Sequence, residues 1–125
     1  MTAVTGSDRD PAVITWSGLA EHDPLPGITG SVRLGEQLSA AIFRLAAGAV
    51  VPLHSHGNEE FGQVLSGSLT LEIEERRSAL TAGDGFLIPG EIPHAAVAGP
   101  HGCLLLECYA PARDPFPPTD PGSTR

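Results

Sequence analysis

Glycine and proline interrupt this chain so often that its apolar runs stay short. The 125 residues include 15 glycines and 12 prolines, and helical periodicity of useful length is absent between them. Short apolar runs bounded by turn residues are typical of strands. The length supports one hydrophobic core but not two. We therefore expect a single domain with an all-β fold and many turns.

Charge and hydropathy exclude several classes of partner. The net charge of −8 argues against nucleic acid, because phosphate binding needs a basic face. No stretch approaches the roughly 18 apolar residues that span a bilayer, and the N-terminus lacks the features of a signal peptide. Cys103 and Cys108 share an apparent strand and are too far apart to bridge within it. These features predict a cytoplasmic protein with reduced thiols and neither membrane nor nucleic acid as a partner.

Three histidines and a glutamate form the most informative cluster of the sequence. His54 and His56 are two positions apart, so on a strand they project from the same face. Glu60 follows closely, and His94 comes later, after a Gly-Asp turn and Pro93. Imidazole and carboxylate are the usual ligands of first-row metals. We expect one divalent transition metal (Zn, Ni, Fe, Mn, Co or Cu) bound by His54, His56, Glu60 and His94.

The coarse pattern of strands and loops follows from alternation and turn residues. We expect a loop over residues 21–30 and a hairpin tip at 75–77. Strands are expected over residues 12–16, 31–34, 38–46, 50–56, 60–65, 69–73, 86–88, 94–98 and 103–109.

The residues of the metal cluster resemble the two motifs of the cupin superfamily. The first motif runs Gly, five residues, His-x-His, three residues, Glu, six residues, Gly, and it is filled by Gly48, His54, His56, Glu60 and Gly67. The second runs Gly, five residues, Pro, then His, and is filled by Gly83, Pro89 and His94, with the next glycine displaced to Gly90 and Ala98 where Asn is frequent. The resemblance implies a jelly roll, a small antiparallel β-barrel with one metal in its mouth. It divides the chain into an N-terminal, partly loose segment at residues 1–24, a cupin barrel at 25–116 and a Pro-rich tail at 117–125.

A narrower resemblance concerns the last strand. The run HSHGNEEFGQVLSGSL and the end LLECYAPARDPF look like small cupins that ketonise unsaturated uronates and cupins that cyclise aromatic polyketides. In that group an acid and an arginine are thought to face the pocket, which carries over to Glu107 and Arg113, with Tyr109 beside them. The group often has Gln in place of Glu60 and Asp in place of Glu107, which leaves the substrate open.

The chemistry of these residues predicts a metal-dependent enzyme. Four protein ligands leave room for water or substrate, as in catalytic metal sites. Strand alternation puts Glu107 and Tyr109 on one face, where Glu107 would act as general acid or base and Arg113 would hold a substrate carboxylate. We expect non-redox proton transfer on a small oxygen-rich substrate: ketonisation, cyclisation or dehydration by an isomerase, lyase or cyclase.

Other interpretations remain open from the sequence. Glu60 as a negatively charged ligand would also suit an Fe- or Mn-dependent dioxygenase or oxidase, and a cupin barrel can bind a small ligand without catalysis. Glu107 and Arg113 could be exposed charges, and Tyr109 a packing residue. The expected N-terminal strand, together with an apolar face formed by Leu104, Leu106 and Cys108, predicts a homodimer.

Overall fold

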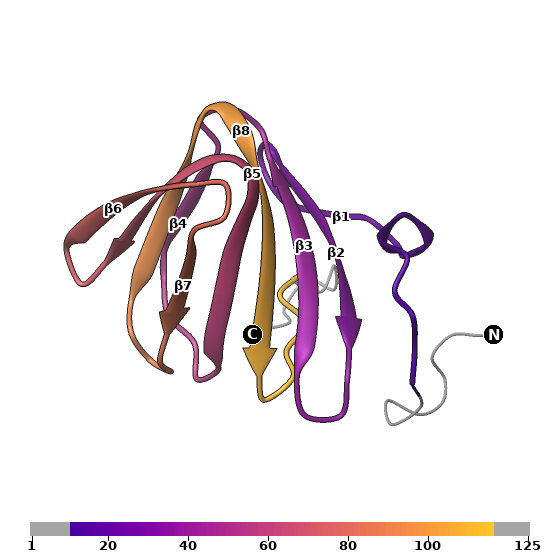
Figure 1. Ribbon diagram of the computed structural model, residues 1–125. Coiled ribbons are helices and arrows are strands. Elements are labelled where there is room, and N and C mark those ends of the chain that lie inside the picture. The colour runs from indigo at the N-terminus through magenta and orange to yellow at the C-terminus, as the bar shows by residue number, and fades with distance from the viewer. Residues whose placement is uncertain (1–10, 117–125) are drawn as a thin grey trace.

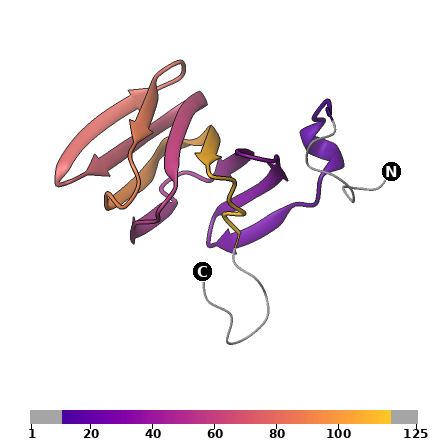
Figure 2. The ribbon, with the colours of Figure 1, turned by 90° about the horizontal axis from the view of Figure 1, so that it is seen from below.

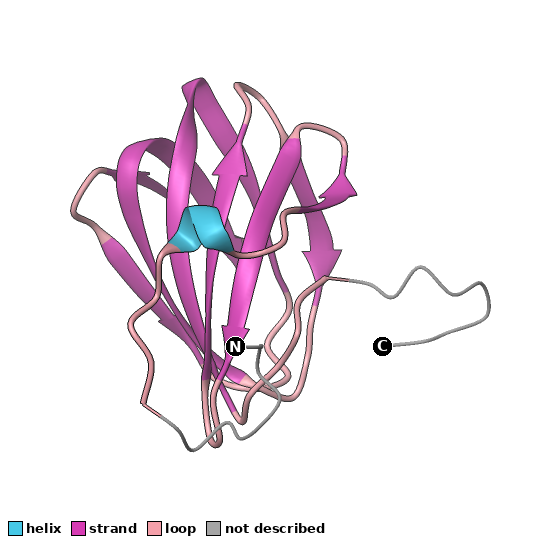
Figure 3. Ribbon diagram, turned by 90° about the vertical axis from the view of Figure 1, so that its right-hand side faces the viewer, coloured by secondary structure: helices cyan, strands magenta, loops and turns pink. Residues whose placement is uncertain are grey.

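The computed structural model describes residues 11–116, which form a twisted antiparallel sheet of eight strands folded over on itself (Figure 1). One short 3-10 helix, Trp16–Gly18, lies outside the strands and is the only helix within that range (Figure 3). The strands are β1 His22–Leu25, β2 Ile28–Leu34, β3 Ser39–Leu45, β4 Val50–His54, β5 Glu59–Ile73, β6 Arg76–Thr81, β7 Gly85–Ile88 and β8 His94–Ala110.

Two long strands, β5 and β8, organise the fold because each belongs to two sheets. They pair with each other from Glu59↔Ala110 to Ile73↔His94. The first half of β5 and the second half of β8 are flanked by β7 and β3, which gives the sheet β1-β2-β3-β8-β5-β7. Their other halves are flanked by β6 and β4, which gives the sheet β4-β8-β5-β6. Seen from below, the strands curve around an interior (Figure 2). The predicted all-β jelly roll is therefore confirmed.

Glycine is required where β5 and β8 bend from one sheet into the other. The pairing register shifts between Val64 and Ser66 and again between Gly67 and Leu69. Gly67 and Gly102 both have φ of +77°, and a Cβ on Gly67 would lie 2.1 Å from the Gly102 carbonyl oxygen. Only glycine permits this backbone conformation and this approach without strain. The last glycine of the first motif thus forms the corner of the barrel.

The hydrophobic core lies between the two sheets. Along the first half of β5, Glu60, Gly62 and Val64 are buried while their neighbours are more exposed, the alternation expected of a strand with one inward face. Both sheets contribute buried side chains to the central cluster, among them Ile28, Leu45, Val64, Leu69 and Leu105. The same inward faces continue toward the barrel mouth, where they carry the candidate site.

The structure corrects the expected start of the sheet. The strand predicted over residues 12–16 is wrong, because residues 11–15 have no regular structure and Trp16 begins the helical turn. The loop predicted over 21–30 is also wrong, because β1 and β2 form a hairpin that turns at Gly27, whose φ is +76°. Pro24 is tolerated there because β1 is an edge strand, where a missing N–H costs no ladder bond.

Other boundaries differ in detail. Residues 60–73 and 94–109 were each expected as two strands, yet β5 and β8 run through the turn signals as continuous, bent strands. Strand β4 ends at His54, so His56 lies in the following loop. The hairpin tip is at Glu74 and Glu75, with φ of 52° and 71°, a turn whose twist matches the flanking strands.

Three further expectations concern the thiols, the membrane and the domain boundaries. Cys103 and Cys108 are both free. Within residues 11–116, no helix is long and apolar enough to cross a membrane. The sheet begins at His22, and residues 1–10 and 117–125 lie outside the described part of the chain, so the division at 24 and 116 stays a prediction.

Candidate metal centre

The four predicted metal ligands come from three segments and line one cavity of about 290 Å³. His54 is the last residue of β4, and it pairs with His94, the first residue of β8. His56 follows in the loop, and Glu60 lies on the inward face of β5. The two motifs therefore meet because β4 and β8 are neighbouring strands.

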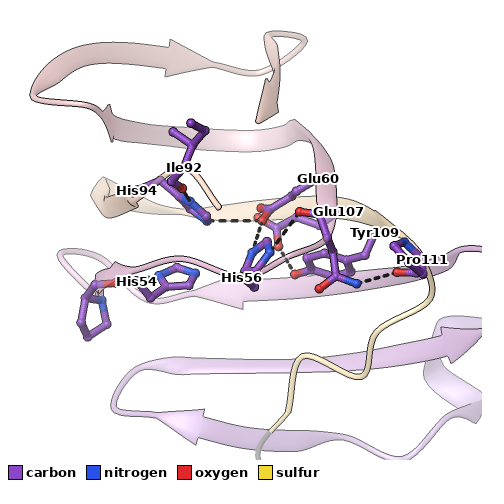
Figure 4. A network of polar contacts seen from close by, with 10 residues as sticks. His54, His56, Glu60, Ile92, His94, Glu107, Tyr109 and Pro111 are labelled. Atoms are coloured by element: carbon purple, nitrogen blue, oxygen red, sulfur yellow. Dashed lines mark hydrogen bonds and ion pairs between the residues drawn. The ribbon is translucent and has the colours of Figure 1, made fainter. Parts of the chain in front are cut away.

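The three histidines form a tight cluster (Figure 4). Each ring contributes one nitrogen atom to a set of three, and these three atoms all lie within 4.8 Å of one another. The centroids of the His54 and His94 rings are 4.3 Å apart, and the His56 ring lies 5.1 Å from that of His94. Such an arrangement brings three imidazole nitrogens to one point, as a metal centre requires.

Backbone carbonyls fix the orientation of all three rings. His54 Nδ1 lies 2.8 Å from the Pro52 carbonyl oxygen, and His56 Nδ1 lies 3.2 Å from that of Asn58. His94 Nδ1 lies 2.8 Å from the Ile92 carbonyl oxygen. A carbonyl only accepts hydrogen bonds, so each Nδ1 carries the hydrogen. The lone pair is then on Nε2, which is the ligand atom that a metal would use.

Glu60 adds a carboxylate to this cluster. Its Oε1 lies 3.0 Å from His56 Nε2 and 3.4 Å from His94 Nε2, and its side chain is almost fully buried. Burial disfavours its charge, but the adjacent His56 and His94 rings and the Glu107 carboxyl together outweigh burial and hold the pKa of Glu60 well below its usual value. Glu60 is therefore negatively charged and faces two imidazole nitrogens.

This geometry calls for a positive charge between the rings and the carboxylate. With hydrogen on each Nδ1, the Nε2 atoms and Glu60 Oε1 would face one another as acceptors. His94 Nε2 is buried and has no hydrogen-bond partner among the described residues. Burial opposes a charge on His94, yet Glu60 and the Ile92 carbonyl raise its pKa. Burial lowers the pKa of His54, which keeps that ring neutral. A divalent cation satisfies these atoms together, so the donor set fits a metal. That Glu60 is the fourth ligand stays a prediction.

Glu107 and Tyr109 lie beside this cluster on the inward face of β8, as strand alternation predicted. The Tyr109 hydroxyl donates a hydrogen bond to Glu107 Oε1, and the Glu107 carboxyl is hydrogen-bonded to Glu60. Glu107 lines the cavity and is half-buried. Burial, and then the charge of Glu60, raise the pKa of Glu107 well above its usual value. Burial and Glu107 likewise raise the pKa of Tyr109. The fold therefore favours the protonated form of Glu107, which can donate a proton.

Arg113 enters the cavity from the segment that follows β8. Its guanidinium carbon lies 5.5 Å from the centroid of the Tyr109 ring, a cation–π distance. Its Nε is buried and has no hydrogen-bond partner within residues 11–116. The structure therefore places Glu107, Tyr109 and Arg113 in one row beside the histidine cluster. The roles predicted for them remain predictions.

A C-terminal strap, residues 111–116, holds Arg113 in this place. Ser39 Oγ donates to the Arg113 carbonyl at 2.7 Å and accepts from the Arg113 N–H at 2.9 Å. Asn58 Nδ2 donates to the Pro111 carbonyl at 2.7 Å. The buried Phe116 ring stacks on His22 with centroids 4.6 Å apart. Sequence reasoning missed Ser39 and Asn58, because no local signal marks a residue whose partner lies 74 or 53 positions away.

A family of known proteins matches the chain in sequence. Residues 41–102 match the family described as the cupin domain. This chain carries a cupin domain. The predicted cupin resemblance is therefore confirmed, and the matched segment contains all four predicted metal ligands.

Solved structures superpose on most of the chain. KdgF from Halomonas sp. is 27% identical, with a TM-score of 0.79 over 84% of this chain and 97% of that one. An RmlC-like cupin from Shewanella frigidimarina is 24% identical, with a TM-score of 0.78 over 86% of this chain and 96% of that one. Oxalate decarboxylase from Bacillus subtilis is 21% identical, with a TM-score of 0.72 over 86% of this chain but only 32% of its own. No curated protein matches the chain in sequence.

Proposed function

We propose that this cupin is a mononuclear-metal enzyme that transfers a proton on a small, oxygen-bearing substrate, as in ketonisation, cyclisation or dehydration. The observation that carries the proposal is the hydrogen-bonded row from Tyr109 through Glu107 to Glu60, set directly beside three converging histidines. A proton carrier next to a metal-binding cluster is the combination that such reactions need.

His54, His56 and His94, with Glu60 as the fourth ligand, would hold one divalent transition metal. Zn, Ni, Fe, Mn, Co and Cu all suit imidazole with carboxylate. When bound, the metal polarises a carbonyl or hydroxyl oxygen of the substrate. Manganese occurs in a distant structural relative, since oxalate decarboxylase from Bacillus subtilis has Mn(II) centres. The orientation of each ring by a backbone carbonyl keeps Nε2 available whichever metal is present.

Glu107 is the residue that we assign to the proton transfer. Its raised pKa favours the protonated carboxyl, so that Glu107 would act first as a general acid. The Tyr109 hydroxyl donates to the same carboxyl and fixes its orientation. After giving up the proton, Glu107 would be held by Tyr109 and could take a proton back from the substrate.

Arg113 would position the substrate through an anionic group. Its buried Nε has no partner among the described residues, and its guanidinium lies over the Tyr109 ring. A carboxylate bound there would receive the paired donors of the guanidinium. The sequence resemblance to uronate-ketonising cupins, together with the likeness to KdgF from Halomonas sp., supports a non-redox reaction of this kind.

The variant Glu107→Gln tests the proposal. It keeps the shape of the side chain and removes the transferable proton. We expect turnover to fall roughly 10²- to 10⁴-fold while the metal content is unchanged. Deuterium incorporation from heavy water into the product, followed by mass spectrometry, measures the step with unsaturated uronates and aromatic polyketide analogues as substrates. Glu59→Gln, at an exposed position of the neighbouring strand β5, is the matched control. Full turnover in Glu107→Gln would count decisively against the proposal.

A second candidate function is an Fe- or Mn-dependent dioxygenase or oxidase. The observation that favours it is the ionised Glu60 beside the histidines, because a negative ligand stabilises higher oxidation states of the metal. Activity that is unchanged under strict anaerobiosis would remove this candidate. A third candidate is a cupin that binds a small ligand without catalysis, which saturable binding with no product would favour.

A further inference from the structure

The cavity beside the metal cluster has apolar walls on both sheets. The first sheet contributes Ile28, Leu45 and Leu105, and the second contributes Val51, Leu69 and Leu71. The Phe86 ring also lines the cavity, and Gly62 makes room for it, since a Cβ there would lie 2.1 Å from the ring. The strand backbone behind these side chains is already paired in the two sheets.

The polar side chains of the cavity are confined to one region. Apart from the three histidines and Glu60, the polar side chains that line it within residues 11–116 are Glu107, Tyr109 and Arg113. These groups touch one another in sequence, from Glu60 to Glu107, to Tyr109 and to Arg113. They form a single polar patch that faces an otherwise apolar space.

A ligand that fits this cavity must likewise carry its polar atoms on one side and have an apolar body on the other. A ligand hydroxyl that gives up its hydrogen bonds to water and forms none with the protein weakens binding by roughly tenfold. Polar atoms of the ligand are therefore tolerated only against the polar patch. A sugar acid carries hydroxyl groups around its whole ring, and most of them would face leucine, valine or phenylalanine. An apolar ring against those walls instead gains affinity from the water it displaces.

We propose that the substrate is an apolar molecule of one or two rings whose oxygens are gathered along one edge, and that it is not a sugar acid. One or two edge oxygens would meet the metal and Glu107, and an anionic group would meet Arg113. This inference rests on the proposed function for the assignment of the metal end. The preference for an apolar body follows from the cavity walls alone.

Binding to the zinc-loaded protein, freed of excess metal, tests the inference by calorimetry. The probes are 1-hydroxy-2-naphthoate, which carries both oxygens on one edge of an apolar body, and galacturonate, which is hydroxylated around its ring. We expect the naphthoate to bind at least about thirtyfold more tightly. Val51→Thr, which puts a hydroxyl into the wall, should weaken naphthoate binding roughly three- to tenfold. Val97→Thr is the matched control, because Val97 is 43% exposed and does not line the cavity.

Each outcome separates this inference from the proposed function. Equal affinities, tighter binding of galacturonate, or no binding of either probe overturns the inference, as does an equal effect of the two valine variants. If the naphthoate preference holds but Glu107→Gln retains turnover, the proposed proton transfer fails while the apolar ligand class stands. If galacturonate is preferred and Glu107→Gln loses turnover, the enzyme proposal stands with a different substrate.

Discussion

At the scale of single residues, Glu60 is the side chain whose role is easiest to isolate. Glu60→Gln keeps the size of the side chain and removes the negative charge that faces His56 and His94. We expect the affinity for a divalent metal to fall roughly tenfold or more, because charge and orientation at the ligand cluster set that affinity. Competition titration against a chromogenic chelator measures the change.

Glu59→Gln is the control for this measurement, since Glu59 neighbours Glu60 on β5 and is exposed. Its metal affinity should equal that of the unaltered protein. Equal affinities for the two glutamine variants would show that Glu60 is no ligand, and the three histidines would then bind metal without it.

Alkaline titration gives a second residue-scale prediction, because the chain contains no lysine. The side chains that titrate between about pH 9 and 12 are therefore the two cysteines and the single tyrosine. Burial raises the pKa of Cys103 to about 11 and also raises those of Cys108 and Tyr109. A raised pKa means that the fold favours the protonated form. The contribution to stability is complete below about pH 9 and is lost as the pH rises through 11.

Urea denaturation at pH 8, 9, 10 and 11 measures this loss. We expect the free energy of unfolding to be constant at the lower two values and to decrease at the upper two. A free energy that stays level or increases up to pH 11 would contradict the burial assigned to these three groups.

The sequence predicted the cluster of candidate ligands better than it predicted the surroundings of that cluster. His54 and His56 were expected on one strand, and the structure brings both to the cluster although His56 lies past the end of β4. Spacing sufficed because the motif residues are local to one strand and its loop. The backbone carbonyls that orient the rings, and the hydrogen bond between Glu107 and Glu60, depend on side-chain conformation and could not be predicted.

At the scale of elements, the C-terminal strap depends on Ser39. This fully buried hydroxyl makes two hydrogen bonds to the backbone of Arg113. Ser39→Ala should lower the free energy of unfolding by about 1–3 kcal/mol, because it leaves a buried donor and acceptor unpaired. Urea denaturation measures the loss, and Ser78→Ala on the exposed face of β6 is the control.

The control should change stability by no more than about 0.5 kcal/mol, as surface substitutions usually do. The same loss in both serine variants would mean that Ser39 does not hold the strap. Because the strap carries Arg113, we also expect Ser39→Ala to weaken the binding of an anionic ligand without changing the metal content.

Element boundaries were predicted poorly where a glycine or proline does not end a strand. The turn residues around Gly67 and Gly102 suggested breaks, whereas both glycines serve as bends within β5 and β8. Pro24 suggested a loop, whereas it occupies an edge strand. In each case the residue type favours a turn or loop, but pairing with a strand distant in the sequence keeps the segment in the sheet.

At the scale of the whole molecule, β5 and β8 create both the cavity and the site because each strand passes from one sheet into the other. The two halves of each strand lie in different sheets, so inward-facing residues of a single strand reach both the apolar walls and the metal cluster. Alternation and the two motifs predicted this barrel, because they specify which residues face inward. The apolar interior of the cavity required the pairing of the sheets and was not predicted.

The outer face of the first sheet carries the apolar residues that suggested a homodimer. Leu104, Leu106 and Cys108 are half-buried on β8, and Phe61 and Leu87 are exposed on the neighbouring strands. Nothing in the structure shows what covers this face, so the homodimer stays a prediction.

Metal content measured by elemental mass spectrometry tests the central claim most directly. The untagged protein should contain about one equivalent of a first-row divalent metal, and His54→Ala should lose it. Because a metal that binds only the folded state stabilises that state, a chelator should lower the melting temperature of the unaltered protein and leave the variant unchanged. Absence of metal from both proteins after reconstitution, with the same melting temperature with and without chelator, would contradict the account.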